Sequence, residues 1–267
     1  MASQHEDDDE DDIDPIKMLL QNKLEIDNRL PTEHDAEETQ RHYIRSIDST
    51  VVIRQLPFEG LSFQLWPAAT TLVTLLDNHR VDPTNIALSR TLSTVSKGLD
   101  HPKINILELG SGTGLVGIAA ASILGANVTV TDLPHVISNL EFNIEANADI
   151  LTLQGGSVRA KPLRWGEAED VEKIGRDYDL IMASDVVYHQ HLFEPLIETL
   201  RLLLGGEERM VFVMAHLKRW KKESAFFKRA KKLFQVETIH VDNPREGSRT
   251  GVVVYRFAAK QQKLTIC

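Results

Sequence analysis

From residue 104 onward, short apolar runs rich in β-branched residues alternate with stretches whose apolar positions recur at helical spacing. The apolar runs predict strands over residues 104–109, 127–132, 157–165, 178–188, 209–217, 234–241 and 251–259. The helical spacing predicts helices over residues 115–124, 140–148, 191–204 and 224–234. Apolar strands separated by helices predict an α/β fold with a mostly parallel, doubly wound sheet.

The last two predicted strands break this alternation, because no helical pattern lies in their connection at residues 242–250. A connection this short cannot make the right-handed helical crossover that parallel strands need, so the two strands should form an antiparallel hairpin. We therefore predict a seven-stranded, Rossmann-like sheet that is mostly parallel and has an antiparallel C-terminal strand. Dinucleotide-binding sheets of the Rossmann type normally stay parallel.

The pattern before residue 104 is less regular. A β-branched run from residue 50 predicts a strand, and Pro57 and Gly60 separate it from a short second strand. A helix should begin at Pro67, and the polar connection over residues 80–103 has room for another short helix. Residues 15–50 are polar and helix-permissive, which predicts a helical or partly ordered N-terminal extension.

An acidic run at residues 6–14, EDDDEDDID, carries most of the net charge of −9. Like charges at this density repel one another, so we predict a disordered acidic tail over residues 1–14. One interpretation is that this tail only keeps the chain soluble; the other is that it contacts a basic partner. The extension at 15–50 and one domain at 51–267 would complete the chain.

The overall composition, with 42% hydrophobic and 26% charged residues, is ordinary for a globular protein. No apolar run approaches the about 20 residues that span a bilayer, so no membrane partner is expected. The N-terminal sequence lacks the basic and apolar parts of a signal peptide. Cys267 is the single cysteine, so a disulfide within the chain is impossible and a cytoplasmic or nuclear location is expected.

A glycine turn follows the strand at 104–109. Gly110, Gly112 and Gly114 allow a sharp turn and a close approach of a ligand to the backbone, and the next helix directs its N-terminal amides there. The motif alone is weak, because Gly112, Gly114 and Gly117 also fit the dinucleotide pattern G-x-G-x-x-G. Asp132 follows at the spacing that places an acidic residue on a ribose in either kind of site.

The charge of Glu108 favours one ligand over the other. This residue stands two positions before the first glycine, and no Lys or Arg lies between residues 106 and 127 to compensate it. A pyrophosphate beside it would meet a like charge, whereas a ligand with amino and sulfonium cations would be attracted. The turn is therefore predicted to hold a cationic ligand.

Four segments then follow one another in a recognisable order: ILELGSGTGLVGIAAA, VTVTDLPHVISNLEFNIEAN, LRWGE and YDLIMASDVVYHQHLFEPLIETL. Together with LWPAA around Trp66, they resemble the seven-β-strand protein-lysine methyltransferases of the methyltransferase-like group, the lysine methyltransferase family 16 type. The resemblance runs from about Trp66 to Leu204. Its most specific element is D-x-x-Y at Asp185 to Tyr188, and the antiparallel C-terminal strand also suits that sheet.

This resemblance implies S-adenosyl-L-methionine as cofactor and assigns roles to matching positions. The glycine turn would contact the amino-acid end of the cofactor, Asp132 the ribose and Trp165 the adenine, with Trp66 on the methionine side. A tryptophan followed by a glycine at the end of a strand also offers a flat apolar wall for a purine. The predicted cofactor-binding residues are Trp66, Glu108, Gly110, Ser111, Gly112, Gly114, Asp132, Trp165 and Ser184.

The acceptor is predicted to be a lysine amine. Conjugated amide and base nitrogens are typically held by an Asn/Asp-Pro-Pro-aromatic turn where this chain reads SDVVY. A lysine amine must lose its proton before it attacks, and Asp185 and Tyr188 would hold and orient it as the catalytic pair. Asp185 would alternatively act through the structure around it.

The expected partner is thus a protein and not a nucleic acid, and the enzyme is expected to be a monomer. By resemblance, the substrate would be a chaperone, an elongation factor or another nucleotide-binding protein. Three alternatives stay open: a small-molecule methyltransferase on the same fold, an NAD-dependent oxidoreductase, and a non-catalytic protein-binding adaptor.

Two further groups of residues carry weaker signals. His189, His191 and His216 lack metal-ligand spacing, so they are interpreted as solvated or helix-start histidines, and no metal is expected. The stretch KRWKKESAFFKRAKK at residues 218–232 has apolar residues at helical spacing between many Lys and Arg. It is interpreted as a surface helix with a solvated basic face, or as a face that docks an acidic protein or the chain's own tail.

Overall fold

The computed structural model describes residues 37–84, 87–97, 99, 101–205, 210–244 and 250–260. The predicted acidic tail, most of the predicted extension and Cys267 lie outside the described residues. Within the described residues, no helix is long and apolar enough to cross a membrane.

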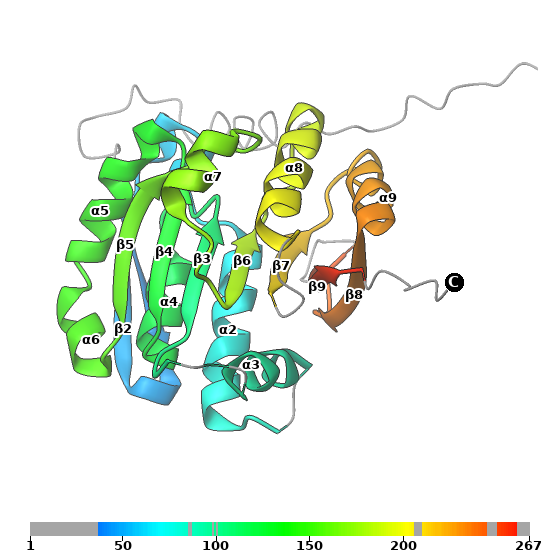
Figure 1. Ribbon diagram of the computed structural model, residues 1–267. Coiled ribbons are helices and arrows are strands. Elements are labelled where there is room, and N and C mark those ends of the chain that lie inside the picture. The colour runs from blue at the N-terminus through cyan, green and yellow to red at the C-terminus, as the bar shows by residue number, and fades with distance from the viewer. Residues whose placement is uncertain are drawn as a thin grey trace, which may run out of the picture.

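Seven strands form one sheet in the order β5-β4-β3-β6-β7-β9-β8 (Figure 1). The first five in the chain pair in parallel, and β9 lies antiparallel between β7 and β8. The predicted mixed sheet with an antiparallel C-terminal strand is therefore confirmed. The strands are β3 (Asn105–Leu109), β4 (Asn127–Asp132), β5 (Ser157–Pro162), β6 (Leu180–Ser184), β7 (Val211–Leu217), β8 (Phe234–Val241) and β9 (Val252–Ala259).

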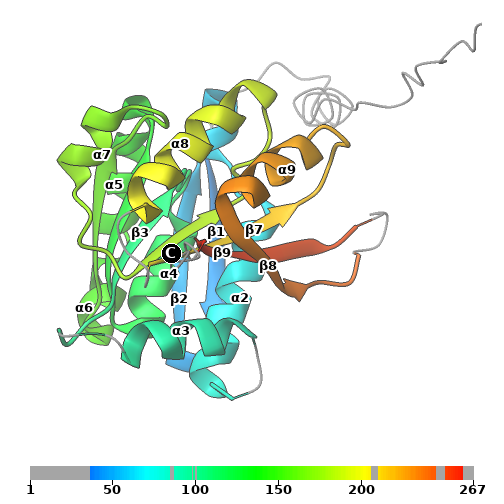
Figure 2. The ribbon, with the colours of Figure 1, turned by 45° about the vertical axis from the view of Figure 1, so that its right-hand side comes forward.

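Helices cover both faces of this sheet, as Figure 2 shows. Neighbouring residues on β3 serve opposite cores, since Ile106 packs with the first group of helices and Leu107 with the second. The first group is α2 (Pro67–Val81), α3 (Ala87–Lys97), α4 (Leu115–Leu124), α5 (Ile137–Glu145) and α6 (Ala148–Gln154). The second is α7 (Ala168–Ile174), α8 (Phe193–Leu204) and α9 (Ser224–Leu233).

A two-stranded hairpin, β1 (Glu38–Ile44) and β2 (Ser49–Gln55), packs on the first group of helices. Two asparagine side chains dock the hairpin. Asn143 of α5 exchanges a pair of hydrogen bonds with the backbone of Arg54, and Asn147, just before α6, does the same with Val52. Residues 38–50 are therefore mainly strand, where a helix-permissive extension was predicted. Strand β1 pairs with β2, which follows it after the short turn at residues 45–48.

Three other local predictions differ from the structure. The short second strand after Pro57 is instead two 3₁₀ turns, Pro57–Glu59 and Leu61–Phe63. The helix predicted over 140–148 begins earlier, at Ile137, and ends at Glu145, and Asn147 between α5 and α6 bonds to the hairpin through its side chain. Helix α7 was not predicted, since its seven residues contain few apolar positions.

Candidate active site

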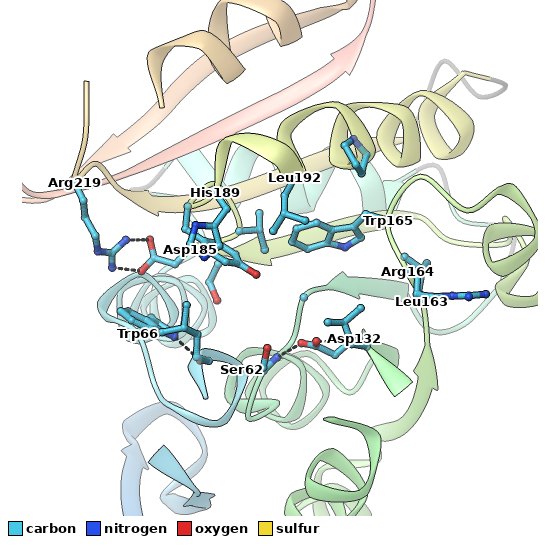
Figure 3. A pocket seen from close by; sticks show the side chains of 18 residues that line it. Ser62, Trp66, Asp132, Leu163, Arg164, Trp165, Asp185, His189, Leu192 and Arg219 are labelled. Carbon is cyan, nitrogen blue, oxygen red and sulfur yellow. Dashed lines mark hydrogen bonds and ion pairs between the residues drawn. The ribbon is translucent and has the colours of Figure 1, made fainter. Parts of the chain in front are cut away.

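A pocket lies at the carboxyl ends of the central strands, where ligands bind in open α/β sheets. Its walls come from the ends of β4 and β6, from the segments after β3, β5, β6 and β7, from the start of α8 and from the turn before α2 (Figure 3). The structure brings eight of the predicted site residues to this pocket: Trp66, Gly110, Gly112, Asp132, Trp165, Ser184, Asp185 and Tyr188.

The glycine turn leaves no room for side chains. All three glycines have positive φ angles, and a Cβ on Gly110 would lie 2.8 Å from the Trp165 ring and 2.9 Å from Val186. The aromatic wall therefore packs directly on the turn. Ser111 and Gly114 do not line the pocket. They close the turn instead, since the Ser111 amide donates to Thr131 and the Gly114 amide donates to Ser111.

Asp132 ends β4 beside this turn and is 8% exposed. Its carboxylate accepts hydrogen bonds from the amides of Gly112 and Leu133, both at 2.8 Å. Burial raises the pKa of this carboxyl group. The bond to Gly112 ties the end of one strand to the turn after its neighbour, so both lie at fixed places on one side of the pocket.

Glu108 does not line the pocket, although it was predicted to face the ligand. Its side chain lies behind the turn, where its Oε2 would be 2.7 Å from a Cβ on Gly117 of α4. It is 1% exposed, neither oxygen has a hydrogen-bond partner among the described residues, and burial raises its pKa to about 8. A carboxyl that is mostly protonated at neutral pH does not supply the negative charge on which the sequence argument relied.

Asp185, on the opposite side of the pocket, accepts hydrogen bonds from three other residues of the chain. Its side chain is 2% exposed and accepts from the amides of Leu217, at 2.9 Å, and Ala68, at 3.3 Å. The Arg219 guanidinium adds two parallel bonds, from Nη1 at 3.2 Å and Nη2 at 3.0 Å. Asp185 also has a φ of 55°, a left-handed conformation that is strained for a residue with a side chain. Its contacts hold it in that conformation.

Arg219 was missed as a site residue by the sequence analysis. Its guanidinium lies over the Trp66 ring, 5.1 Å from the ring centroid, and Trp66 itself donates from Nε1 to the Leu61 carbonyl. Figure 3 shows Arg219, Asp185 and Trp66 together at one end of the pocket, with Trp165 at the other. One signal was available: Arg219 stands two residues beyond the end of β7, at the same edge as the other strand ends.

Of the remaining tyrosine and histidine side chains discussed above, Tyr188 and His189 line the pocket, and His216 is buried behind it. Tyr188 lines the pocket, and burial, assisted by the charge of Asp132, raises its pKa to about 12, so it keeps its hydroxyl proton. His189 lines the pocket and stacks with His191. His216 was interpreted as solvated, but it is 1% exposed and its Nε2 lies 3.0 Å from Glu223. Among the described residues, no group of three His, Cys, Asp or Glu side chains is placed to hold a metal.

A family model described as lysine methyltransferase matches residues 46–233, which is most of the chain and includes every pocket residue named above. The chain belongs to the lysine methyltransferase family. It is therefore an enzyme of protein-lysine methylation that depends on S-adenosyl-L-methionine. Membership also removes the NAD-dependent oxidoreductase as an alternative.

The relatives agree with this assignment. Protein N-lysine methyltransferase METTL21A of Danio rerio is 33% identical over 187 residues, covering 70% of this chain and 75% of that protein. EEF1A lysine methyltransferase 3 of Xenopus tropicalis is 39% identical over 109 residues, covering 41% of this chain and 46% of that protein. Four relatives, among them METTL21A of Danio rerio, are matched over 57% to 80% of their own lengths.

A solved structure supports the fold. The T. thermophilus 16S rRNA N2 G1207 methyltransferase RsmC, in complex with AdoMet and guanosine, has a TM-score of 0.52 and 17% identity, covering 87% of this chain and 52% of that one. At this identity the likeness concerns the fold alone.

The pocket suits the cofactor of the family. Gly110 and Gly112 present backbone to the pocket, Asp132 offers carboxylate oxygens beside them, and Trp165 packs its ring on the turn. When bound, S-adenosyl-L-methionine supplies a methyl group on a sulfonium leaving group. Because that carbon is already activated, the protein residues need only bind, align and exclude water.

Proposed function

We propose that this pocket binds S-adenosyl-L-methionine across the ends of β3, β4 and β5 and methylates a lysine side chain of a partner protein at the end of β6. The observation that carries the proposal is the direct packing of Trp165 on Gly110, with Asp132 beside the same turn. In our assignment, Trp165 contacts the adenine, Asp132 the ribose, and Gly110 with Gly112 the amino-acid end. Trp66 and Ser184 line the methionine side.

The acceptor side follows from the chemistry of an amine. A lysine amine in water has a pKa of about 10.4, so most of it is protonated at neutral pH and unable to attack. A partly apolar site lowers that pKa by disfavouring the charged form. We assign Tyr188 to orient the neutral amine through its hydroxyl, which keeps its proton up to high pH. Asp185, the other member of the predicted pair, lines the same pocket and is bound by Arg219 and two backbone amides.

The substrate is proposed to be a nucleotide-binding protein. The name of the Xenopus tropicalis relative identifies EEF1A as the substrate of that enzyme, which supports an elongation factor as the first candidate here. Chaperones are the second candidate, as the family resemblance implies. We propose that the enzyme acts as a monomer in the cytoplasm or nucleus.

The test is to incubate the full chain with cell extract and radiolabelled cofactor, and to identify the labelled protein by mass spectrometry. Calorimetric titration with S-adenosylhomocysteine, with NAD as the negative control, reports the cofactor site separately. A lysine carrying the label supports the proposal. Cofactor binding without any labelled protein would support the adaptor alternative, and label on a small molecule would support the small-molecule alternative.

A further inference from the structure

The carboxylate of Asp185 is already fully used inside the protein. A carboxylate offers roughly four lone-pair positions. Four N–H groups occupy them: the amides of Leu217 and Ala68 and the two terminal nitrogens of Arg219. An incoming lysine would therefore find no open oxygen on Asp185. Asp185, the acidic residue of the D-x-x-Y motif, is therefore bound within the protein and is not available to a ligand.

Arg219 is held as firmly as the carboxylate it binds. Its Nη1 also donates to the Leu217 carbonyl at 3.0 Å, and its backbone amide donates to Glu223 at 3.1 Å. Its guanidinium lies over Trp66, a geometry in which a cation and an aromatic ring attract each other. One arginine thus joins the ends of β6 and β7 to the turn before α2.

The charges of Asp185 and Arg219 compensate each other. Asp185 and Arg219 form a bidentate pair within 3.2 Å, and the neighbouring His216 lies 3.7 Å from the same carboxylate and contacts Glu223 behind it. The titratable and charged groups across the pocket are Tyr188, His189, Asp132 and Arg164, the last of which is paired with Asp170. A lysine ammonium beside the wall would gain no uncompensated anion from Asp185.

We propose that Arg219 is the positioning residue of the acceptor side: by compensating the charge of Asp185 and stacking on Trp66, it forms a wall without a free anion at Asp185, which admits the target lysine as the free amine. This inference rests on the proposed function. It makes Asp185 a positioning residue as well, and it leaves Tyr188 as the polar side chain of the predicted pair that is available to the amine.

The stacking of Arg219 on Trp66 is tested without any substrate. The full chain contains three tryptophans, so 5-fluorotryptophan labelling gives three ¹⁹F resonances that single Trp→Phe variants assign. In Arg219→Met we expect the Trp66 resonance to shift and broaden, while that of Trp165 keeps its position and its response to S-adenosylhomocysteine. Arg219→Lys should give a smaller change. A Trp66 resonance that is unmoved in Arg219→Met overturns the proposed stack.

The electrostatic half is tested by the pH profile of methyl transfer to the protein labelled in cell extract, between about pH 6 and 9 with saturating cofactor. In Arg219→Met, the unpaired Asp185 should favour the lysine ammonium and move the acid limb upward by about one pH unit or more. Arg219→Lys keeps the charge, so its limb should stay in place while its rate falls roughly tenfold for loss of the fork. Asp185→Asn/Arg219→Met, which carries neither charge, should return the limb toward the wild-type position.

An acid limb that does not move in Arg219→Met, in a variant that binds S-adenosylhomocysteine normally, overturns the electrostatic role. A limb that moves equally in Arg219→Lys would also overturn it, because that variant retains the cation. Failure of the proposed function looks different, since the wild-type chain would then label no protein at any pH, while the ¹⁹F experiment would still decide the geometry.

Discussion

At the scale of single residues, two buried carboxyl groups at the ends of neighbouring strands differ in their hydrogen bonding. Asp185 is paired with four donors, whereas Glu108 has none among the described residues. The first is a fixed part of the pocket wall. The second is a neutral acid at ordinary pH, because burial opposes its ionisation.

This difference predicts a pH dependence of stability. The pKa of Glu108 rises from 4.5 to about 8 on folding, so between these values the native chain binds a proton that the unfolded chain has lost. Its contribution to the free energy of unfolding therefore falls as the pH rises through that range. In Glu108→Gln this fall should be absent, and urea titrations across the range should show the variant gaining a few kcal/mol relative to wild type. Parallel curves for the two proteins would contradict the prediction.

The packing of Trp165 on Gly110 predicts a second residue-scale effect. Gly110→Ala would place a Cβ 2.8 Å from the ring at a φ of 60°, so S-adenosylhomocysteine should bind at least tenfold more weakly by calorimetry. Gly155→Ala is the matched control, because Gly155 has a φ of 70° but nothing within 4 Å of the added atom. The control should lose stability by about 1 kcal/mol through backbone strain and keep its affinity. Equal affinity losses would show that strain alone is responsible.

At the scale of elements, the N-terminal hairpin is docked by side-chain amides that imitate a neighbouring strand. Asn143 and Asn147 each donate to a carbonyl of β2 and accept from its amides. Because β2 leads through two short turns to Trp66, this docking also supports one wall of the pocket.

Asn147→Ala should therefore loosen the hairpin while leaving the main sheet intact. Removing two part-buried hydrogen bonds to Val52 and a buried one to the Asn143 carbonyl should lower the free energy of unfolding by about 1–3 kcal/mol. Hydrogen exchange should accelerate at the amide of Val52 and stay slow in β3 and β4. Asn127→Ala, which removes an exposed bond to the Asn105 side chain, is the control. Equal protection at Val52 in both variants would contradict this role for Asn147.

The sequence predicted the apolar elements well and the polar, exposed elements poorly. Helix α4 and strands β4 and β8 lie at the predicted bounds, because apolar spacing and terminal glycines define them locally. Strand β1 was not predicted, because its residues are mostly polar and exposed and show no apolar alternation, although it pairs with the predicted strand β2. Eight of the predicted site residues line the pocket, while Ser111, Gly114 and Glu108 do not, and Arg219 was hidden in a basic run.

At the scale of the whole molecule, the basic residues of α9 form an exposed face beside the segment that carries Arg219. Lys228, Lys231 and Lys232 are exposed, while Arg229 is paired with Glu194. The helix packs through Phe226 and Ala230, as its apolar spacing predicted. The choice between a solvated face and a docking face is open to experiment.

If this face docks an acidic substrate, charge reversal of Lys228, Lys231 and Lys232 to Glu should raise the KM for the labelled protein several-fold at low salt. The effect should shrink at high salt, because exposed charges are screened beyond about 10 Å at 0.1 M. The kcat value should not change, since these side chains lie outside the pocket. An unchanged KM at low salt would identify the face as merely solvated.

The position of β9 has a consequence for synthesis on the ribosome. Strand β8 reaches the sheet only through β9, which is made after it and inserts between β8 and β7. Until those final residues leave the exit tunnel, the β7 edge stays open and β8 has no place to add, so a nascent chain exposes an unpaired edge. A stop codon before Val252 would thus cost two strands instead of one, and the truncated product should be a ready target for chaperones and proteases.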